Sequence, residues 1–350
     1  MHDIMRYIRF ARGSNASDLH LVAGVPPAVR VNGEIIMLKA EPLTRERAKD
    51  LAYQLLNREQ IAHFEKEKEL CFSISDGEFG RIRVTVYYHA GCPELSVRLC
   101  ALQIADAEAL GLPPIVNELA RKPDGLVLIT GANGVGKTTT LNFMVDLINR
   151  ERHCKIVTIE DPVEYVHKPN KSIIVQQEVH TDTLSFSRAL MHVLRQNPDI
   201  IVIGEMRELQ AIETALTAAE TGHLVLATLH TPSVKQTVER ITSVFQAGQQ
   251  RQIVMQLANS IQGIIAQDLV PRADGKGRVL AYEVLVANPA IRAVIRENNA
   301  AMLYNIVSTS RKEGMITMDA CLQDLYQKAL ISYDAAVSRA TDPHRIGSSA

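Results

Sequence analysis

One short stretch of the sequence, GANGVGKTTT at residues 131–140, has residue types suited to binding a polyphosphate. It follows the apolar run GLVLIT and satisfies the pattern G-x-x-x-x-G-K-[ST]. Its glycines allow the backbone to curl, so that successive N–H groups and the positive end of the next helix point at phosphate oxygens. Lys137 is then expected to reach the β- and γ-phosphates, and the Thr138 hydroxyl to complete the shell of a Mg²⁺ ion.

The alternative for this stretch is a glycine-rich turn that binds nothing. Average residue frequencies give a chance match in roughly one per cent of chains of this length. The apolar run before the loop and the helical pattern after it make chance a poorer explanation still, so the sequence predicts a nucleotide-binding loop. The predicted nucleotide-binding residues are Gly131, Ala132, Asn133, Gly134, Val135, Gly136, Lys137, Thr138 and Thr139.

Acidic residues follow two further apolar runs of the same kind. KIVTIE ends in Glu160, with Asp161 and then Glu164 close behind, and DIIVIGE ends in Glu205. Ligands of open α/β sheets bind beyond the carboxyl ends of the strands. A carboxylate there can hold metal-bound water or orient a nucleophilic water beside Mg²⁺ and polyphosphate. A single such carboxylate is often only a helix N-cap, but their convergence favours a shared site.

Two histidines flank the run HLVLATLH, His223 at its start and His230 at its end. Either can be an ordinary structural histidine, and the pattern alone leaves this open. A zinc site is disfavoured because no third ligand lies nearby in sequence.

The elements that position these residues fall into two regions. Residues 1–101 predict an α+β domain, with strand-like runs in HLVAGVPPAVRVNGEIIML, LCFSIS, RIRVTVYYHA and ELSVRLC and one helical stretch, TRERAKDLAYQLLNREQIAHFEKEK. Residues 102–114, rich in turn formers at their end, predict a linker. From residue 115 to 350, apolar runs alternate with helical segments, which predicts a parallel sheet covered by helices on both faces.

Composition bounds the possible partners. The chain has 350 residues and is 46% hydrophobic, enough for a substantial core, and its 38 Lys+Arg against 39 Asp+Glu provide no global positive field for nucleic acid. Its five cysteines form no C-x-x-C pair, which fits a reducing cytosol. The N-terminal segment mixes charges into every turn and no window approaches 18 uninterrupted apolar residues, so we expect any membrane contact to be peripheral.

Three arginines of the first domain, Arg81, Arg83 and Arg98, lie on predicted strands far in sequence from the phosphate loop. The simpler interpretation is a charged, exposed strand face. If a neighbouring subunit presents this face to the nucleotide, the same residues become arginine fingers that stabilise transition-state charge. Position in the sequence does not decide between the two.

Taken together, these segments resemble the type IV pilus retraction ATPases of the secretion ATPase superfamily, over nearly the whole chain. ASDLHLVAGVPPAVRVNG resembles their opening module, GANGVGKTTT their Walker A motif, TIEDPVEY their aspartate box, NPDIIVIGEMRE their atypical Walker B motif and TGHLVLATLHT their histidine box. The resemblance implies a PAS-like first domain, a RecA-like second domain and a ring-shaped homohexamer with nucleotide between subunits.

Roles for individual residues follow from the same resemblance. It implies that Glu164 is the catalytic base that polarises water and that Glu205 is the Walker B acid, sharing the Mg²⁺ ion with Thr138. It places Arg81, Arg83 and Arg98 at the family's nucleotide-contacting arginines. The residues implied to sense the state of the nucleotide are Glu160, Asp161, His223 and His230.

A helical motif separates retraction from extension motors. PAIRAVIREN resembles the AIRNLIRE motif of the retraction motors and opens a C-terminal helical region at about residues 288–340, whereas extension ATPases carry a tetracysteine zinc module that this sequence lacks. The motif residues are Ala290, Ile291, Arg292, Ala293, Val294, Ile295, Arg296 and Glu297. From periodicity alone, the segment is an amphipathic helix that buries its aliphatic residues and leaves Arg292, Arg296 and Glu297 solvated.

The resemblance implies a cytoplasmic, Mg²⁺-dependent ATP hydrolase that powers pilus retraction at the cytoplasmic face of the inner membrane. Its implied partners are further copies of itself and the inner-membrane pilus platform protein, with a second retraction or extension ATPase as another candidate. Three alternatives stay open: an accessory retraction motor, a nucleic-acid translocase on the same core, and a scaffold that binds ATP without hydrolysing it. The balanced charge argues against the translocase.

Overall fold

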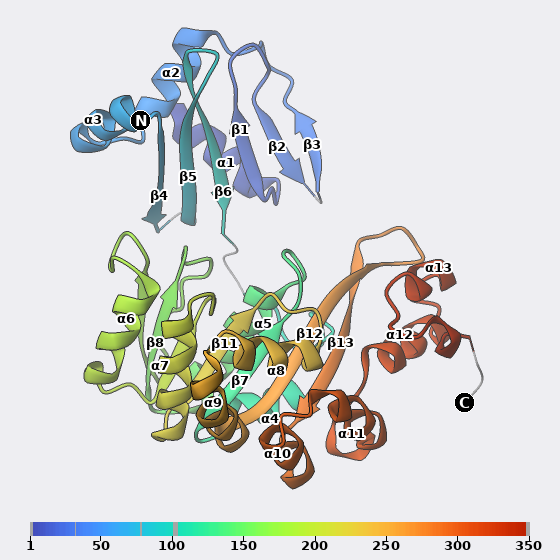
Figure 1. Cartoon of the computed structure of the whole chain (residues 1–350). Coiled ribbons are helices and arrows are strands. Elements are labelled where there is room, and N and C mark those ends of the chain that lie inside the picture. The colour runs from blue at the N-terminus through green and yellow to red at the C-terminus, as the bar shows by residue number, and fades with distance from the viewer. Residues whose placement is uncertain (1–2, 32, 78, 101–103, 348–350) are drawn as a thin grey trace. The chain divides into compact units, whose positions relative to one another are not determined.

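The computed structural model describes residues 3–31, 33–77, 79–100 and 104–347 (Figure 1). The chain divides into two compact units, one formed by residues 1–103 with 164–166 and the other by 104–163 with 167–350. The predicted end of the first domain at residue 101 and the start of the predicted linker lie outside the described residues.

The first unit is built on a six-stranded sheet in the order β3-β2-β1-β6-β5-β4. Every pair of neighbouring strands is antiparallel. The strands are β1 Asp18–Leu21, β2 Ala28–Val31, β3 Glu34–Met37, β4 Glu69–Asp76, β5 Gly80–His89 and β6 Cys92–Leu99. Alternation along β5 and β6 sends apolar side chains such as Val84 and Val97 to one face and polar side chains to the other.

Helices cover the apolar face of this sheet. They are α1 Asp3–Gly13, α2 Arg45–Tyr53 and α3 Arg58–Glu67, and Ile8, Leu51 and Phe64 share a buried cluster with the strand residues. The sequence predicted one helix where the structure has α2 and α3. The division falls at Asn57, whose side chain accepts from the backbone N–H of Gln60 while the Gln60 side chain accepts from the Asn57 N–H, a capping box that starts a new helix.

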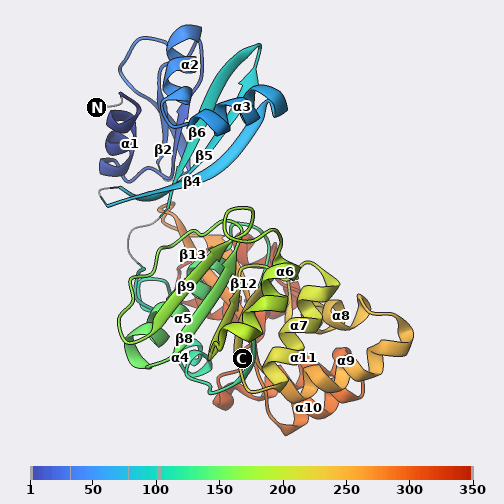
Figure 2. The same cartoon turned by 90° about the vertical axis from the view of Figure 1, so that its left-hand side faces the viewer.

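The second unit contains a seven-stranded sheet, which Figure 2 shows obliquely. Its strand order is β13-β12-β7-β11-β10-β8-β9. All neighbours are parallel except the edge pair of β12 and β13. The strands are β7 Gly125–Thr130, β8 Lys155–Glu160, β9 Ile173–Glu178, β10 Ile200–Ile203, β11 Leu224–Leu229, β12 Ile261–Pro271 and β13 Arg278–Val286. The four strands expected from the sequence are β7, β8, β10 and β11, and all four are confirmed.

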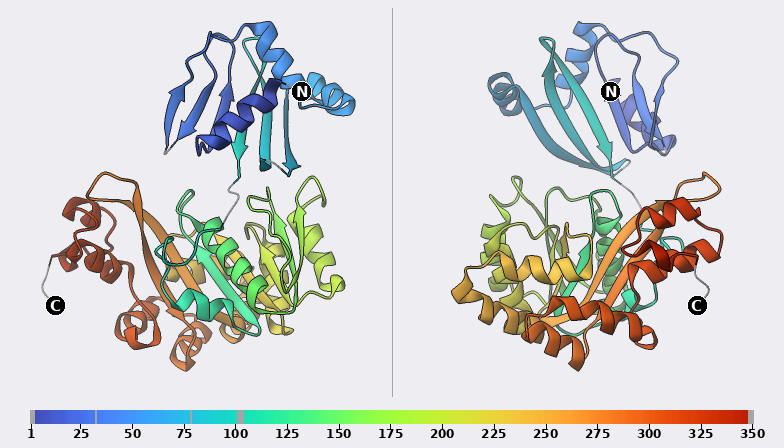
Figure 3. Two further views of the ribbon diagram at one scale, coloured as in Figure 1. Left: turned by 180° about the vertical axis from the view of Figure 1, so that it is seen from behind. Right: turned by 45° about the vertical axis from the view of Figure 1, so that its right-hand side comes forward.

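Helices pack on both faces of this sheet, as predicted (Figures 1 and 3). One face is covered by α4 Ile115–Ala120 and α5 Lys137–Glu151. The other carries α6 Phe186–Val193, α7 Leu209–Glu220, α8 Val234–Ser243, α9 Ala247–Ser260, α10 Pro289–Arg296 and α11 Leu303–Thr309. The last helices, α12 Met318–Gln327 and α13 Tyr333–Val337, form a smaller cluster with residues of β12 and β13.

Short 3-10 turns lie at Leu194–Gln196, Ala300–Met302, Arg311–Glu313 and Pro343–Arg345. In the predicted linker, Leu112 is buried and Ile104, Ala107 and Leu110 pack against the cluster of α4 and α5, so the described part of that segment belongs to the second unit's core. Among the described residues, none of the helices combines the length and apolar character that crossing a membrane requires.

Candidate active site

The predicted phosphate loop joins β7 to α5, and β7 lies beside the central strand β11 of the second unit's sheet (Figure 1). Gly131 has a φ of +135°, and a Cβ placed there would lie 2.3 Å from the Gln267 carbonyl oxygen on β12. Gly136 adopts the left-handed conformation directly before α5. These two positions need glycine, one for space and one for backbone conformation.

The loop and the start of α5 form a surface suited to an anion. Gly136 caps α5 without a side-chain hydrogen bond, so no side-chain oxygen occupies the N–H groups of the first turn. Those N–H groups and the helix dipole favour negative charge at this end. Ala132, Asn133 and Gly134 are exposed while Val135 is buried, so the loop is anchored at its base and open at its tip.

Lys137 turns back onto the loop. Its side chain is 7% exposed. The Nζ atom donates to the Gly131 and Ala132 carbonyl oxygens, each at 2.8 Å, and lies 3.3 Å from His230 Nδ1. Burial lowers the pKa of Lys137, and the nearby Glu205 carboxylate opposes that shift. The ammonium group is therefore held where a polyphosphate on the loop would meet it.

His230 links this lysine to Glu205. His230 Nε2 is 2.6 Å from Glu205 Oε1, and Arg207 Nε also contacts that carboxylate. A neutral imidazole with its proton on Nε2 satisfies both contacts, because Nδ1 then accepts from Lys137 while Nε2 donates to Glu205; this tautomer is assigned from the hydrogen-bond network. The structure thus brings together Lys137, His230 and Glu205 from the carboxyl ends of β7, β11 and β10.

Arg207 was not predicted as part of the site. Its hydrogen bond to Glu205 raises its pKa, the Glu205 charge acts in the same direction, and the charge of Asp161 adds to it. The signal in the sequence was its place two residues after Glu205, within GEMRE.

The carboxylates that follow β8 differ in their surroundings. Glu160 is 4% exposed and accepts hydrogen bonds from Thr158 Oγ1 at 2.6 Å and Gln176 Nε2 at 3.1 Å. Its carboxylate is therefore buried at the carboxyl end of β8. Asp161 and Glu164 are exposed. In sequence, Glu164 directly follows Val163 and precedes His167 by three residues, and both Val163 and His167 are buried.

His223 lies at the other end of β11 from His230 and the phosphate loop. It precedes β11, and its carbonyl oxygen accepts from the N–H of Gly125, the first residue of β7. At about 3.3 Å per strand residue, this places it roughly 20 Å from the phosphate loop, at the amino ends of the parallel strands. Its Nδ1 lies 3.0 Å from the Ala218 carbonyl oxygen near the end of α7. A nucleotide-sensing role for His223 stays a prediction.

The three arginines of the first unit share the polar face of its sheet. Arg83 and Arg98 are directly paired across β5 and β6, and Asp18 is paired with Arg98 across β1 and β6. Arg98 Nε lies 3.1 Å from Asp18 Oδ1, and Arg30 Nε lies 3.5 Å from Oδ2. Two residues from Arg83 along β5, Arg81 contacts Ser75. The face is therefore basic, with Asp18 as a counter-ion.

The motif that resembles the retraction motors forms α10. Ile291 and Ile295 are buried and Val294 is partly buried, as periodicity predicted. Arg292 is not solvated as expected: its Nη1 donates to the Ala258 and Asn259 carbonyl oxygens, at 2.6 and 2.5 Å, in the last turn of α9. The half-buried Arg292 satisfies helix-terminal carbonyls there that would otherwise lack partners.

The possible metal ligands near the phosphate loop suit Mg²⁺ that binds together with a nucleotide better than a metal ion held by the protein alone. Among the described residues, no group of three or more His, Cys, Asp and Glu is arranged to hold a metal ion. Mg²⁺ in phosphoryl-transfer sites usually takes one or two protein ligands, with phosphates and water completing its shell. The Thr138 hydroxyl and the Glu205 carboxylate meet that limited requirement.

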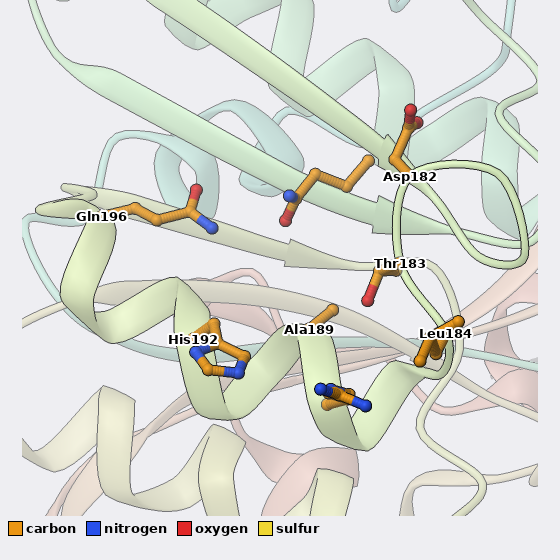
Figure 4. Close-up of a pocket in the computed structure, with 8 residues that line it drawn as sticks. Asp182, Thr183, Leu184, Ala189, His192 and Gln196 are labelled. Carbon is orange, nitrogen blue, oxygen red and sulfur yellow. The ribbon is translucent and has the colours of Figure 1, made fainter.

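A separate pocket of about 280 Å³ lies between β9 and α6 (Figure 4). Arg188 and His192 of α6 line it together with Gln177 of β9 and Asp182 of the following loop. None of the described residues that line this pocket belongs to the predicted site.

Comparisons with known proteins agree over nearly the full chain. The family model for "Type II/IV secretion system protein" matches residues 4–330. The "Type IV pilus retractation ATPase PilT" of Pseudomonas aeruginosa is 41% identical, covering 97% of this chain and 99% of the relative. The "Twitching motility protein" of Neisseria gonorrhoeae is 38% identical over 97% of this chain and 91% of the relative.

Solved structures give the same picture. The crystal structure of the pilus retraction motor PilT with bound ADP superposes with a TM-score of 0.91 at 42% identity and covers 98% of each chain. That agreement confirms the predicted fold class. The protein therefore belongs to the type II/IV secretion system protein family, within its group of type IV pilus retraction ATPases.

Proposed function

We propose that this protein is a Mg²⁺-dependent ATP-hydrolysing motor that powers type IV pilus retraction. The observation that carries the proposal is the contact chain from Lys137 through His230 to Glu205 beside the phosphate loop. It places a cation, a neutral imidazole and a carboxylate around the place where a triphosphate on that loop would end. The relatives named for pilus retraction and twitching motility support the motor's task.

Each residue of the site has a definite task in this proposal. Backbone N–H groups of the loop and of α5 bind the phosphates, and the Lys137 ammonium neutralises charge on them. The Thr138 hydroxyl and Glu205 would hold Mg²⁺, which would supply charge stabilisation to the phosphates. Glu164 orients the attacking water and accepts its proton. His230 hydrogen-bonds to both Lys137 and Glu205, so a change at either one alters its contacts.

We also propose that the chain works as a homohexamer with nucleotide held between subunits. In that arrangement the basic sheet face with Arg81, Arg83 and Arg98 supplies positive charge to a neighbour's nucleotide. Work on a pilus further requires contact with the inner-membrane platform protein, which would hold the ring at the cytoplasmic face of the inner membrane. If sites are shared between subunits, the ATPase rate per chain falls on dilution.

The test compares two site variants with one matched control. Lys137→Ala should weaken nucleotide binding and turnover together, because it removes the cation that meets the phosphates. Glu164→Gln should keep nucleotide affinity and lower kcat by about 10²-fold or more, the usual contribution of a positioned base. Glu213→Gln, on the exposed side of α7, makes the same chemical change away from the site and should leave both quantities unaltered.

The same assays separate the alternatives. Normal turnover in Glu164→Gln would contradict the assigned base, and nucleotide binding without phosphate release in the unaltered protein would favour the scaffold. Stimulation of hydrolysis by polynucleotides would favour the translocase. The chain is also 38% identical to the "Type IV pilus ATPase PilU" of Pseudomonas aeruginosa, so retraction should be measured with this protein as the sole motor. Failure of retraction there would identify an accessory motor.

A further inference from the structure

The connection between β8 and β9, residues 161–172, is irregular although it joins two parallel neighbouring strands. Such crossovers are usually built around a helix that packs on the sheet. Here side-chain hydrogen bonds from α5 hold the connection instead. The segment includes Glu164, so the contacts that fix it also decide where the proposed base can be.

Two buried asparagines on α5 hold this connection. Asn142 and Asn149 are 3% and 2% exposed, and their spacing of two helical turns puts them on the same side of the helix. Asn149 Nδ2 donates to the Lys168 carbonyl oxygen and its Oδ1 accepts from the Asn170 N–H, both at 2.9 Å. Buried amides are costly unless satisfied, so these contacts fix the later part of the connection.

Asn142 makes an equivalent contact nearer to Glu164. Its Oδ1 lies 2.7 Å from Nε2 of His167, and its Nδ2 donates to the Thr138 carbonyl oxygen at 2.8 Å. One side chain therefore touches both the first turn of α5 and the histidine that follows Glu164. With its amide donor used by Thr138, Asn142 can only accept from the ring, so His167 carries its proton on Nε2.

His167 is fixed in two ways. Its ring is buried against α5, and its backbone N–H donates to Gln176 Oε1 on β9 at 2.9 Å. Burial lowers the pKa of His167 to about 4, although the charge of Asp146 on α5 opposes the shift. The ring is therefore neutral in ordinary conditions and remains a donor to Asn142.

The residue before Glu164 is fixed as well. Val163 is 3% exposed, and its N–H donates to Glu178 Oε2 at 2.9 Å. Glu178 is itself 4% exposed, at the end of β9. We call the segment from Val163 to His167 the Glu164 strap. Both of its ends are held by buried hydrogen bonds, and the residues between them have intermediate or exposed side chains.

We infer that Asn142 and His167 are positioning residues that set the location of Glu164. Consecutive Cα atoms are about 3.8 Å apart, so Glu164 cannot move far while Val163 and His167 are held. The inference rests on the proposed function, in which Glu164 orients the attacking water. A misplacement of about 1 Å can lower a rate by about 10²-fold, so loosening one end of the strap should affect turnover without removing any group that binds nucleotide.

The experiment uses the full chain with variants at both asparagines and at the histidine. His167→Ala and Asn142→Ala each release the end of the strap near Glu164. Asn149→Ala removes an equally buried amide from the same helix face but releases only residues 168–170, so it is the matched control. His167→Gln keeps a neutral side-chain N–H donor and is the conservative variant.

Steady-state ATPase kinetics and hydrogen exchange of the nucleotide-free protein give two independent measurements. We expect kcat to fall by about 10-fold or more in His167→Ala and Asn142→Ala, with KM for ATP within about twofold, and largely to recover in His167→Gln. Amide exchange should accelerate within residues 163–167 in the first two variants and within 168–170 in Asn149→Ala. The exchange measurement needs neither nucleotide nor activity.

Three results would overturn the inference. One is a kcat within twofold of the unaltered protein in both His167→Ala and Asn142→Ala; another is an equal loss of kcat in Asn149→Ala, which would mean general destabilisation. The third is unaltered exchange of residues 163–167 in Asn142→Ala. If His167→Ala does not fold, Asn142→Ala and His167→Gln can still be compared with the unaltered protein and Asn149→Ala. Absence of hydrolysis in the unaltered protein would instead contradict the proposed function, and the exchange measurement would still decide whether the strap is held as inferred.

Discussion

Gly131 and Gly134 lie in one loop with positive φ angles of 135° and 77°, yet their surroundings differ. A Cβ at Gly131 would lie 2.3 Å from the Gln267 carbonyl oxygen and 2.9 Å from Val135 Cγ2, whereas a Cβ at Gly134 would have no atom within 4 Å. Replacing each with Ala therefore separates the cost of backbone conformation from the cost of space. Gly134→Ala is the matched control for Gly131→Ala.

The expected magnitudes follow from these contacts. A left-handed conformation costs a residue with a Cβ about 1–2 kcal/mol, which both variants incur. Gly131→Ala adds a clash with a backbone carbonyl that cannot rotate away, and overpacking of this kind costs a further ~1–3 kcal/mol. We expect destabilisation of about 1–2 kcal/mol for Gly134→Ala and about 2–5 kcal/mol for Gly131→Ala. Because the Gly131 carbonyl also accepts from Lys137, nucleotide affinity should fall with stability in that variant.

Scanning calorimetry without nucleotide measures the stability difference, and binding of a fluorescent ATP analogue measures the affinity. For a unit of this size, 1 kcal/mol corresponds to about 2–4 °C in the transition midpoint. Gly131→Ala should therefore melt several degrees below Gly134→Ala. Equal midpoints for the two variants would refute the claim that β12 presses against the phosphate loop.

Two further predictions concern groups outside the phosphate loop. His167 has a folded-state pKa of about 4 against an unfolded value near 6.5, so the unfolded chain binds more protons between these values and stability must fall as pH drops through that window. The loss by pH 4 should be about 3 kcal/mol greater than in His167→Gln by denaturant titration; equal losses would contradict the burial of a neutral ring. Arg292→Ala should cost about 1.5–3 kcal/mol by removing the donor to the end of α9, whereas exposed Arg296→Ala should stay within about 0.5 kcal/mol. Indistinguishable unfolding curves for these two variants would contradict the helix-capping role.

The fold was predictable where a short stretch of sequence by itself indicates a helix or a strand. β7 and β11 are buried along their whole length, so they appear as uninterrupted apolar runs bounded by polar residues. β9 was missed because it is an edge strand, IIVQQE, whose polar residues break such a run. β12 was missed because it begins directly where α9 ends, and nothing at Ser260 marks the change from helix to strand.

The site residues were likewise predictable where the signal is local in sequence. The spacing of the phosphate loop is local, so its glycines, Lys137 and Thr138 could be assigned from residue types alone. Lys137 and His230 are 93 positions apart in sequence, and their contact appears only after the strands are ordered. His223 and His230 both flank β11 in sequence, but His223 precedes the strand, and in a parallel sheet that places it at the amino ends of the strands, away from the phosphate loop. Asn142 and His167 carry no motif, and their partnership exists only in the packed structure.

The contacts converge on α5, whose first turn continues the phosphate loop. Its Lys137 reaches His230 and through it Glu205, while its Asn142 and Asn149 hold the connection that contains Glu164. A shift of α5 relative to β8 must therefore either break buried hydrogen bonds, each costing about 1–3 kcal/mol if left unsatisfied, or move the connection with it. The second course is the less costly one. We therefore expect a displacement of the phosphate loop to move the Glu164 strap with it, which would keep the proposed base matched to the phosphates.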